Sequence, residues 1–263
     1  MVSIGTVDLP DRMERERYFK DLAYLELSML YAGPVKPSSI AKWKASVPPK
    51  SIGLVAPWVL TDKTPPTASR LWDHDATVGP FRDSGPAKRA LAAYQTALKE
   101  LDAACAVFRS PNLFAPSAAN RDTLKKFFSE VVAPETLDVP VVWIPDGLWE
   151  PLTALTFAGE LGVTCAFDPM VREPGLPPEI YFDLDLTSLY CRISGLGRAG
   201  AIRSEHQEDL AMLIESYGSI PVTVAFDSPQ RWKDARTLKQ LLSESESSES
   251  PDPEEEDDDS SED

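Results

Sequence analysis

The sequence predicts an α/β fold in which eight parallel strands close into a (β/α)8 barrel of the TIM type. Short apolar segments rich in β-branched residues alternate along the chain with segments whose apolar residues recur at helical spacing, a pattern typical of parallel strands joined by helices. The chain of 263 residues, 43% of them hydrophobic, has the length and apolar content of one such barrel. A doubly wound open sheet is the alternative, but no glycine-rich nucleotide loop supports it.

Eight segments have the composition of buried strands. The last of them carries Val222, Val224 and Phe226, whose side chains favour a pleated surface. Two others are interrupted by a charge, Glu26 in the second and Arg192 in the seventh. The expected strands are residues 3–8, 22–29, 52–60, 104–108, 139–144, 163–167, 189–193 and 222–226.

Helical spacing fills most of the intervals between these strands. Residues 85–102 give the clearest case, with Ala90, Tyr94 and Leu98 on one apolar stripe. Residues 170–185 are rich in Pro and Glu without helical spacing, so a long loop is expected where the barrel plan places a helix. The other expected helices are residues 11–21, 37–47, 117–132, 151–161 and 204–217, and a last helix follows the turn at 227–229, with Trp232, Ala235, Leu238, Leu241 and Leu242 at helical spacing.

The composition changes abruptly after Leu242. Residues 243–263 hold twelve acidic residues and no basic one, so the net charge of −16 falls to −4 for residues 1–242. We therefore expect a barrel domain over residues 1–242 and a disordered acidic tail over 243–263, because the tail cannot bury apolar surface. The tail either solvates the protein or engages a basic protein partner by charge.

Composition also excludes several classes of protein. The mild acidity of residues 1–242 argues against a broad nucleic-acid-binding face, which needs clustered Lys and Arg. No apolar run reaches the roughly 18 residues of a membrane span, and the first residues lack the pattern of a secretory signal. Cys105, Cys165 and Cys191 lie in expected strands without a CxxC pair, so we expect buried free thiols in a cytoplasmic protein.

Polar residues gather where the expected strands end, and ligand sites of such barrels lie at the carboxyl ends of the strands. Glu26 and Arg192 are the most informative, because a buried charge is costly unless it is paired or binds something polar. Glu26, Asp168 and Asp227 are the candidate catalytic carboxylates. Capping of the following turn is a competing interpretation for the aspartates that precede Pro or Gly. The strand-end candidates are Asp8, Glu26, Arg109, Asp146, Asp168, Arg192 and Asp227.

Other chemistry is constrained by the residue types present. The two histidines, His74 and His206, fall in a loop and a helix rather than at strand ends, which argues against a histidine-built zinc site. A carboxylate magnesium site stays open, and the sequence leaves the cofactor unknown. Glycoside hydrolysis would need two carboxylates roughly 5–9 Å apart. The cysteines lack a neighbouring base for nucleophilic catalysis.

The order of these pieces resembles the YecE-like family, domain of unknown function 72, over residues 3–242. The resemblance implies a TIM barrel and brings no settled activity with it. It rests on Ile4-Gly5-Thr6, Leu25-Glu26-Leu27, Val55-Ala56-Pro57, the helix at 116–128, Tyr190-Cys191-Arg192-Ile193-Ser194-Gly195 and residues 224–238.

The chain departs from the family pattern mainly at polar positions. Ser194 stands where the family has the histidine of a His-Gly pair, and Asp227 stands in place of the first asparagine of Phe-Asn-Asn. Val7-Asp8-Leu9 replaces Ser-Gly-Trp, and residues 143–146 replace Glu-Phe-Arg-His. The resemblance therefore implies a divergent member that has kept the apolar frame.

We expect a protein that works by binding a partner protein or a small polar ligand, the latter through Asp8, Arg109, Asp146, Arg192 and Ser194. The alternative is a hydrolase of phosphoester or glycosidic bonds that uses Glu26 with Asp168 or Asp227. Convergence of Glu26, Arg192 and Asp168 in an open pocket would favour the enzyme. A mouth plugged by Trp143 and residues 170–185 would favour a scaffold.

Overall fold

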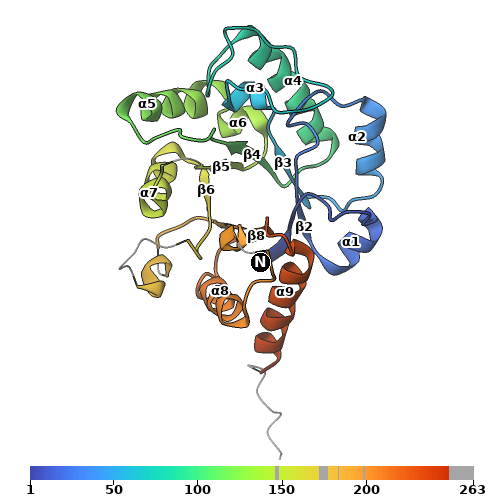
Figure 1. The fold of residues 1–263 in the computed structure, drawn as a ribbon, viewed down its shortest axis with the longest axis vertical. Coiled ribbons are helices and arrows are strands. Elements are labelled where there is room, and N and C mark those ends of the chain that lie inside the picture. Colours follow the sequence, from blue (N-terminus) through green and yellow to red (C-terminus); the bar gives the residue numbers. More distant parts are fainter. Residues whose placement is uncertain (146–147, 172–176, 183, 198, 249–263) are drawn as a thin grey trace, which may run out of the picture.

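Eight parallel strands form a closed barrel in chain order, with β8 hydrogen-bonded back to β1 (Figure 1). The computed structural model describes residues 1–145, 148–171, 177–182, 184–197 and 199–248. The predicted (β/α)8 barrel is thus confirmed. The strands are β1 (Val2–Val7), β2 (Tyr24–Leu27), β3 (Ile52–Val55), β4 (Cys105–Arg109), β5 (Val141–Ile144), β6 (Thr164–Phe167), β7 (Leu189–Ile193) and β8 (Val222–Phe226).

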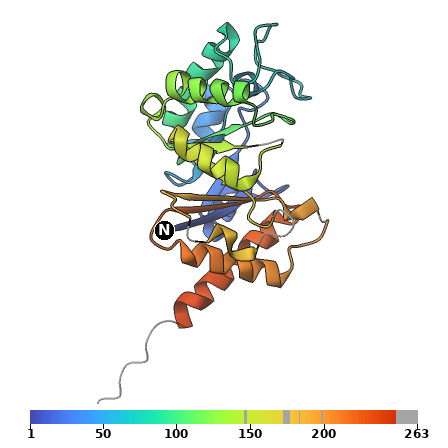
Figure 2. The ribbon, with the colours of Figure 1, turned by 90° about the vertical axis from the view of Figure 1, so that its left-hand side faces the viewer.

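Helices surround the barrel on its outer face (Figure 1). The α5 helix continues as one π-helical turn at Phe127–Val131, and short 3-10 turns lie at Pro178–Tyr181 and Gly195–Gly197. The last helix packs against β1 and β8 and beside α8 (Figure 1 and Figure 2). The helices are α1 (Arg15–Asp21), α2 (Pro37–Lys44), α3 (Trp58–Thr61), α4 (Gly85–Glu100), α5 (Ala118–Lys126), α6 (Pro134–Leu137), α7 (Pro151–Leu161), α8 (Ser204–Ser216) and α9 (Arg231–Ser248).

Local sequence explains where several helices begin and end. The hydroxyls of Ser84 and Ser117 accept hydrogen bonds from backbone N–H groups in the first turns of α4 and α5. Pro37 and Pro151 stand at the first positions of α2 and α7, where no N–H is needed. Gly162 ends α7 with φ of +67°, a left-handed conformation that glycine adopts without a steric penalty.

The strands bury both of their faces, which accounts for their apolar sequences. One set of strand residues faces the barrel interior, and the alternate set packs against the helices. The interior set is Val7, Tyr24, Val55, Cys105, Val107, Val142, Ile144, Ala166, Tyr190 and Ala225.

The third expected strand, residues 52–60, is wrong in its second half. The strand ends at Val55, and Trp58–Thr61 forms the helical turn α3. Pro57 cannot donate a ladder hydrogen bond, and it sits at the cap position of this turn. All four α3 residues are buried, so their apolar run carries no signal that separates a strand from a buried helix.

The start of the predicted tail also needs correction. Helix α9 continues through Ser248, six residues past Leu242, and the Ser245 hydroxyl donates to Glu215 Oε1 (2.5 Å). Residues 249–263 lie outside the described residues. The segment 170–185 contains only the 3-10 turn Pro178–Tyr181 in its described part, in line with the expected absence of a helix there.

Candidate functional site at the barrel mouth

The predicted polar residues meet because their strands are neighbours in the closed barrel. Strands β6, β7, β8, β1 and β2 follow one another around the barrel. Their carboxyl ends bring together Asp168, Arg192, Asp227, Asp8 and Glu26 on one side of the mouth. Arg109 ends β4, on the opposite side from β8.

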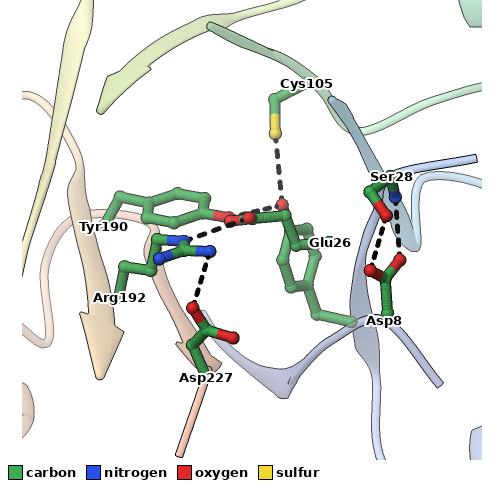
Figure 3. Close-up of polar contacts among 8 residues, drawn as sticks. Asp8, Glu26, Ser28, Cys105, Tyr190, Arg192 and Asp227 are labelled. Atoms are coloured by element: carbon green, nitrogen blue, oxygen red, sulfur yellow. Dashed lines mark hydrogen bonds and ion pairs between the residues drawn. The ribbon is translucent and has the colours of Figure 1, made fainter. Parts of the chain in front are cut away.

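Glu26, Arg192 and Asp227 form one ion-pair network (Figure 3). Arg192 Nε donates to Glu26 Oε1 at 3.1 Å, and Arg192 Nη2 lies 2.9 Å from Asp227 Oδ2. The Glu26 side chain has no exposed surface, whereas the Asp227 side chain is 39% exposed. The network therefore runs from the barrel interior to solvent.

Two tyrosines continue the network into the barrel. The Tyr190 hydroxyl donates to Glu26 Oε2 at 2.7 Å, so both Glu26 oxygens are occupied. The Tyr190 hydroxyl also lies 2.9 Å from the Tyr24 hydroxyl, which is 3.4 Å from Cys105 Sγ. The barrel interior thus contains a connected series of polar contacts surrounded by apolar side chains.

Burial and neighbouring charges shift the pKa values of the tyrosines and the arginine in this network. Burial raises the pKa of Tyr24 and of Tyr190 well above the ordinary value, and the carboxylate of Glu26 adds to the shift. Burial alone would lower the pKa of Arg192, but Glu26 and Asp227 outweigh it and raise that pKa. Neutral tyrosines therefore face a charged arginine and its carboxylate partners.

Asp8 and Asp168 each hold a serine on the neighbouring strand end. Asp8 Oδ1 accepts from the Ser28 backbone N–H (2.9 Å) and Oδ2 from the Ser28 hydroxyl (2.5 Å), as Figure 3 shows. Asp168 Oδ2 accepts from the Ser194 N–H (2.8 Å) and from its hydroxyl (2.6 Å). Asp168 Oδ1 also accepts from the Met170 N–H at 3.0 Å, which is the bond that turn capping requires.

Arg109 borders a separate hollow at the mouth. A pocket of about 460 Å³ lies between the loops that follow β2, β3 and β4, and Tyr31, Asp62, Arg109 and Asn112 line it. The Arg109 guanidinium lies 6.0 Å from the centre of the Tyr31 ring. It forms no ion pair with any carboxylate that the structure describes, so it brings a positive charge to this side of the mouth.

The site differs from the sequence-based expectation in three ways. Asp168 does not join the Glu26–Arg192 network but binds Ser194. Asp227 pairs with Arg192, so the capping interpretation does not account for it. Asp146 lies outside the described residues.

Tyr24, Tyr190 and Ser28 were not expected at the site. Their signal was the alternation of strand residues, since Tyr24 and Ser28 share the face of Glu26, and Tyr190 shares the face of Arg192.

Trp143 does not plug the mouth of the barrel. Trp143 points outward from β5 toward α7, where its ring meets Trp149 edge-on at 4.9 Å and Phe157 at 6.0 Å. Its indole N–H donates to the Ser110 hydroxyl at 2.8 Å. Trp58 and Trp149 are buried in the same core as Trp143.

The described residues contain no group of three or more His, Cys, Asp or Glu side chains that could hold a metal ion. His74 lies edge-on to Trp58 at 5.2 Å, and its Nδ1 is 2.8 Å from the Trp72 carbonyl. The three cysteines are buried and free, as expected. Among the described helices, none has the length and apolar character needed to cross a bilayer.

By sequence, the chain matches no protein-family model and no curated protein. By structure, it is similar to a DUF72 family protein from Enterococcus faecalis V583, with 14% identity over 93% of this chain and 94% of the other and a TM-score of 0.64. A DUF72 family protein from Thermotoga maritima MSB8 shows 16% identity over 92% and 99%, with a TM-score of 0.60. A D-tagatose 3-epimerase-like protein shows 14% identity over 92% and 96%, with a TM-score of 0.55.

The two DUF72 structures confirm the resemblance found in the sequence at the level of the fold. Identities of 14–16% establish the shared fold alone and say nothing of the chemistry at the barrel mouth.

Proposed function

We propose that this DUF72-like barrel is a divergent YecE-like protein that binds a small polar ligand at its mouth without catalysis. The single observation that carries the proposal is the state of Glu26. It is fully buried, and both of its oxygens are engaged by Tyr190 and Arg192. A group held in this way supports a binding surface and is not poised to attack or protonate a substrate.

The hydrolase alternative lacks the free carboxylates that it needs. A glycosidase of the usual kind needs two carboxyl groups that face the bond to be cleaved. Asp168 accepts three hydrogen bonds from Ser194 and Met170, and Asp227 is paired with Arg192. Catalysis by these groups would require the protein to break its own network first.

The charges of the mouth indicate the class of ligand. Asp8, Asp168 and Asp227 are at least partly exposed on one side, whereas Arg109 borders the pocket on the other. The carboxylates suit hydroxyl or ammonium donors, and the guanidinium suits a carboxylate or another anionic group. We therefore propose a hydroxy acid or a zwitterion such as an amino acid, rather than a sugar phosphate that would lie against the carboxylates.

A thermal-shift screen of the full chain tests this proposal with hydroxy acids, amino acids, sugar phosphates and divalent metal ions as probes. A ligand at 100 times its Kd adds about 2.7 kcal/mol of stability, which such a screen detects. We expect a hydroxy acid or amino acid to shift the melting temperature. Titration calorimetry should then show at least a tenfold loss of affinity in both Asp227→Asn and Arg109→Met.

Asp122→Asn and Lys126→Met on the exposed face of α5 are the matched controls, and they should bind as the unmodified chain does. Hydrolysis of a phosphoester or glycoside that is lost in Asp168→Asn would overturn the proposal in favour of the enzyme. A melting temperature that none of the four classes of probe shifts would also overturn the proposal.

We also propose that the protein is cytoplasmic, because its three cysteines are free and buried in the core. A basic protein partner for the acidic tail stays a prediction.

A further inference from the structure

A basic groove lies on the surface where α9 meets α1, away from the barrel mouth. Its volume is about 510 Å³, and its lining includes Lys233, Arg236 and Lys239 of α9 together with Asp21 and Trp232. We call this surface the α9 groove. Its three cations face a single lining carboxylate, so it is locally positive in a chain whose net charge is −16.

The local contacts leave much of this positive charge available. Arg236 Nε lies 3.6 Å from Asp21 Oδ2, but the Arg236 side chain remains 59% exposed. Lys239 Nζ donates to the backbone carbonyl of Asp21 at 2.7 Å, which leaves its charge without a carboxylate. Lys233 is exposed and forms no ion pair with a described residue.

The sequence that follows α9 has the opposite charge. Residues 249–263 hold ten acidic residues and no basic one, and they are joined to α9 at Ser248. At 1.5 Å per helical residue, Lys239 lies about 14 Å and Lys233 about 22 Å back along α9 from Ser248. A segment of fifteen residues can extend over about 50 Å, so it reaches every cation of the groove.

We propose that residues 249–263 bind in cis to the α9 groove, through ion pairs between their carboxylates and Lys233, Arg236 and Lys239. Single exposed ion pairs contribute little, but several on one tethered segment act together. The tether also gives the segment an effective concentration in the millimolar range. The tail and the groove then shield each other, and a basic partner of the tail would have to displace it from α9.

A spin label on the tail tests this arrangement in the full chain. Ser260→Cys provides the attachment site, and the buried native cysteines leave this thiol the reactive one. We expect the label to broaden the backbone amide signals of residues 232–240 and to leave those of α5 sharp. The broadening should vanish at about 1 M salt, where the Debye length falls to about 3 Å.

Two variants and one mixture complete the test. Lys233→Gln with Lys239→Gln should abolish the broadening, whereas Lys42→Gln with Lys44→Gln on the exposed face of α2 should leave it unchanged. A mixture of labelled chain with isotope-enriched, unlabelled chain should show no broadening, because the contact is within one chain. Broadening in that mixture would assign the groove to a second copy. Broadening elsewhere, or none at all, would show that the tail does not use the groove, and each of these results overturns the proposal.

Discussion

Glu26 lies inside the barrel with no exposed side-chain surface, as the negative partner of an ion pair with Arg192. Such a charge persists because Arg192 and Tyr190 supply the hydrogen bonds that water would otherwise give. A buried ion pair is weak evidence of net stability, since its desolvation offsets its attraction. Removal of one partner is a different matter, because the other is then left buried and poorly compensated.

Glu26→Gln should therefore lower the free energy of unfolding by about 3 kcal/mol. The amide keeps the size of the side chain but leaves Arg192 with Asp227 as its remaining partner. The double variant Glu26→Gln/Arg192→Met should recover part of the loss, because it removes both charges. Urea denaturation followed by circular dichroism measures all the variants.

Asp227→Asn serves as the comparison within the same network. Its side chain is 39% exposed, so solvent screens the lost charge and the change should stay within about 1 kcal/mol. Equal losses for Glu26→Gln and Asp227→Asn would contradict the distinction between the buried and the exposed pair.

At the scale of the element, Gly53 in β3 shows how tightly the barrel interior is filled. A Cβ at this position would lie 1.7 Å from the Tyr24 hydroxyl oxygen and 3.1 Å from Cys105 Sγ. Glycine is thus what allows Tyr24 to cross the barrel toward Tyr190.

Gly53→Ala should destabilise the protein by about 3 kcal/mol, because overpacking forces Tyr24 out of its hydrogen bonds. Gly159 in α7 is the matched control, since a Cβ there meets nothing within 4 Å. Gly159→Ala should instead stabilise by roughly 0.5–1 kcal/mol, the difference in helix propensity. Unfolding by urea gives both values, and a similar sign for the two would refute this account.

The elements also show which parts of the fold a sequence can predict. Strand β8 and helix α7 have clear boundaries, because Pro221 precedes one and Pro151 and Gly162 bound the other. The helical turn α3 could not be predicted, since its residues are buried and mostly apolar, like those of the strand before it. The last turns of α9 could not be predicted either. The acidic composition after Leu242 indicated a disordered tail, although the helical spacing of Leu238, Leu241 and Leu242 leads into it.

Strand-end positions predicted Asp8, Asp168 and Asp227 at the candidate site, and a charge that breaks an apolar strand was the second signal. Glu26 and Arg192 stood out for this reason. The partners Tyr24 and Tyr190 did not, since a tyrosine in a strand is ordinary core material. The pairing of Asp8 with Ser28 and of Asp168 with Ser194 depends on strand register, which single-sequence patterns do not specify for strands buried on both faces.

At the scale of the whole molecule, the buried thiols and phenols make the free energy of unfolding fall as the pH becomes alkaline. Burial raises the pKa of Cys105 from 9.0 to about 12 and that of Tyr18 from 10.0 to about 12. The unfolded chain loses these protons at lower pH than the folded chain does. Stability from these groups is therefore fully present below about pH 9 and is lost as the pH rises toward 12.

Urea denaturation between pH 8 and pH 12 should show this loss, with each such group contributing about 1.4 kcal/mol per pH unit inside its window. Cys105→Ala should reduce the slope by the share of one proton, whatever its effect on stability at neutral pH. Parallel profiles for the two proteins would show that the Cys105 thiol does not titrate in this way.

The closing seam of the barrel has a mechanical consequence. Strands β1 and β8 run parallel and pair from Val2 with Val222 to Thr6 with Phe226. A force applied to the start of β1 and the end of β8 would pull these strands in shear, so their hydrogen bonds share the load instead of opening one by one. Glu26 of β2 and Arg192 of β7, the strands on either side of this pair, form an ion pair across it. The ion pair at the mouth thus adds a second connection across the β1–β8 pair. Removing this ion pair would lower the force needed to separate the two strands.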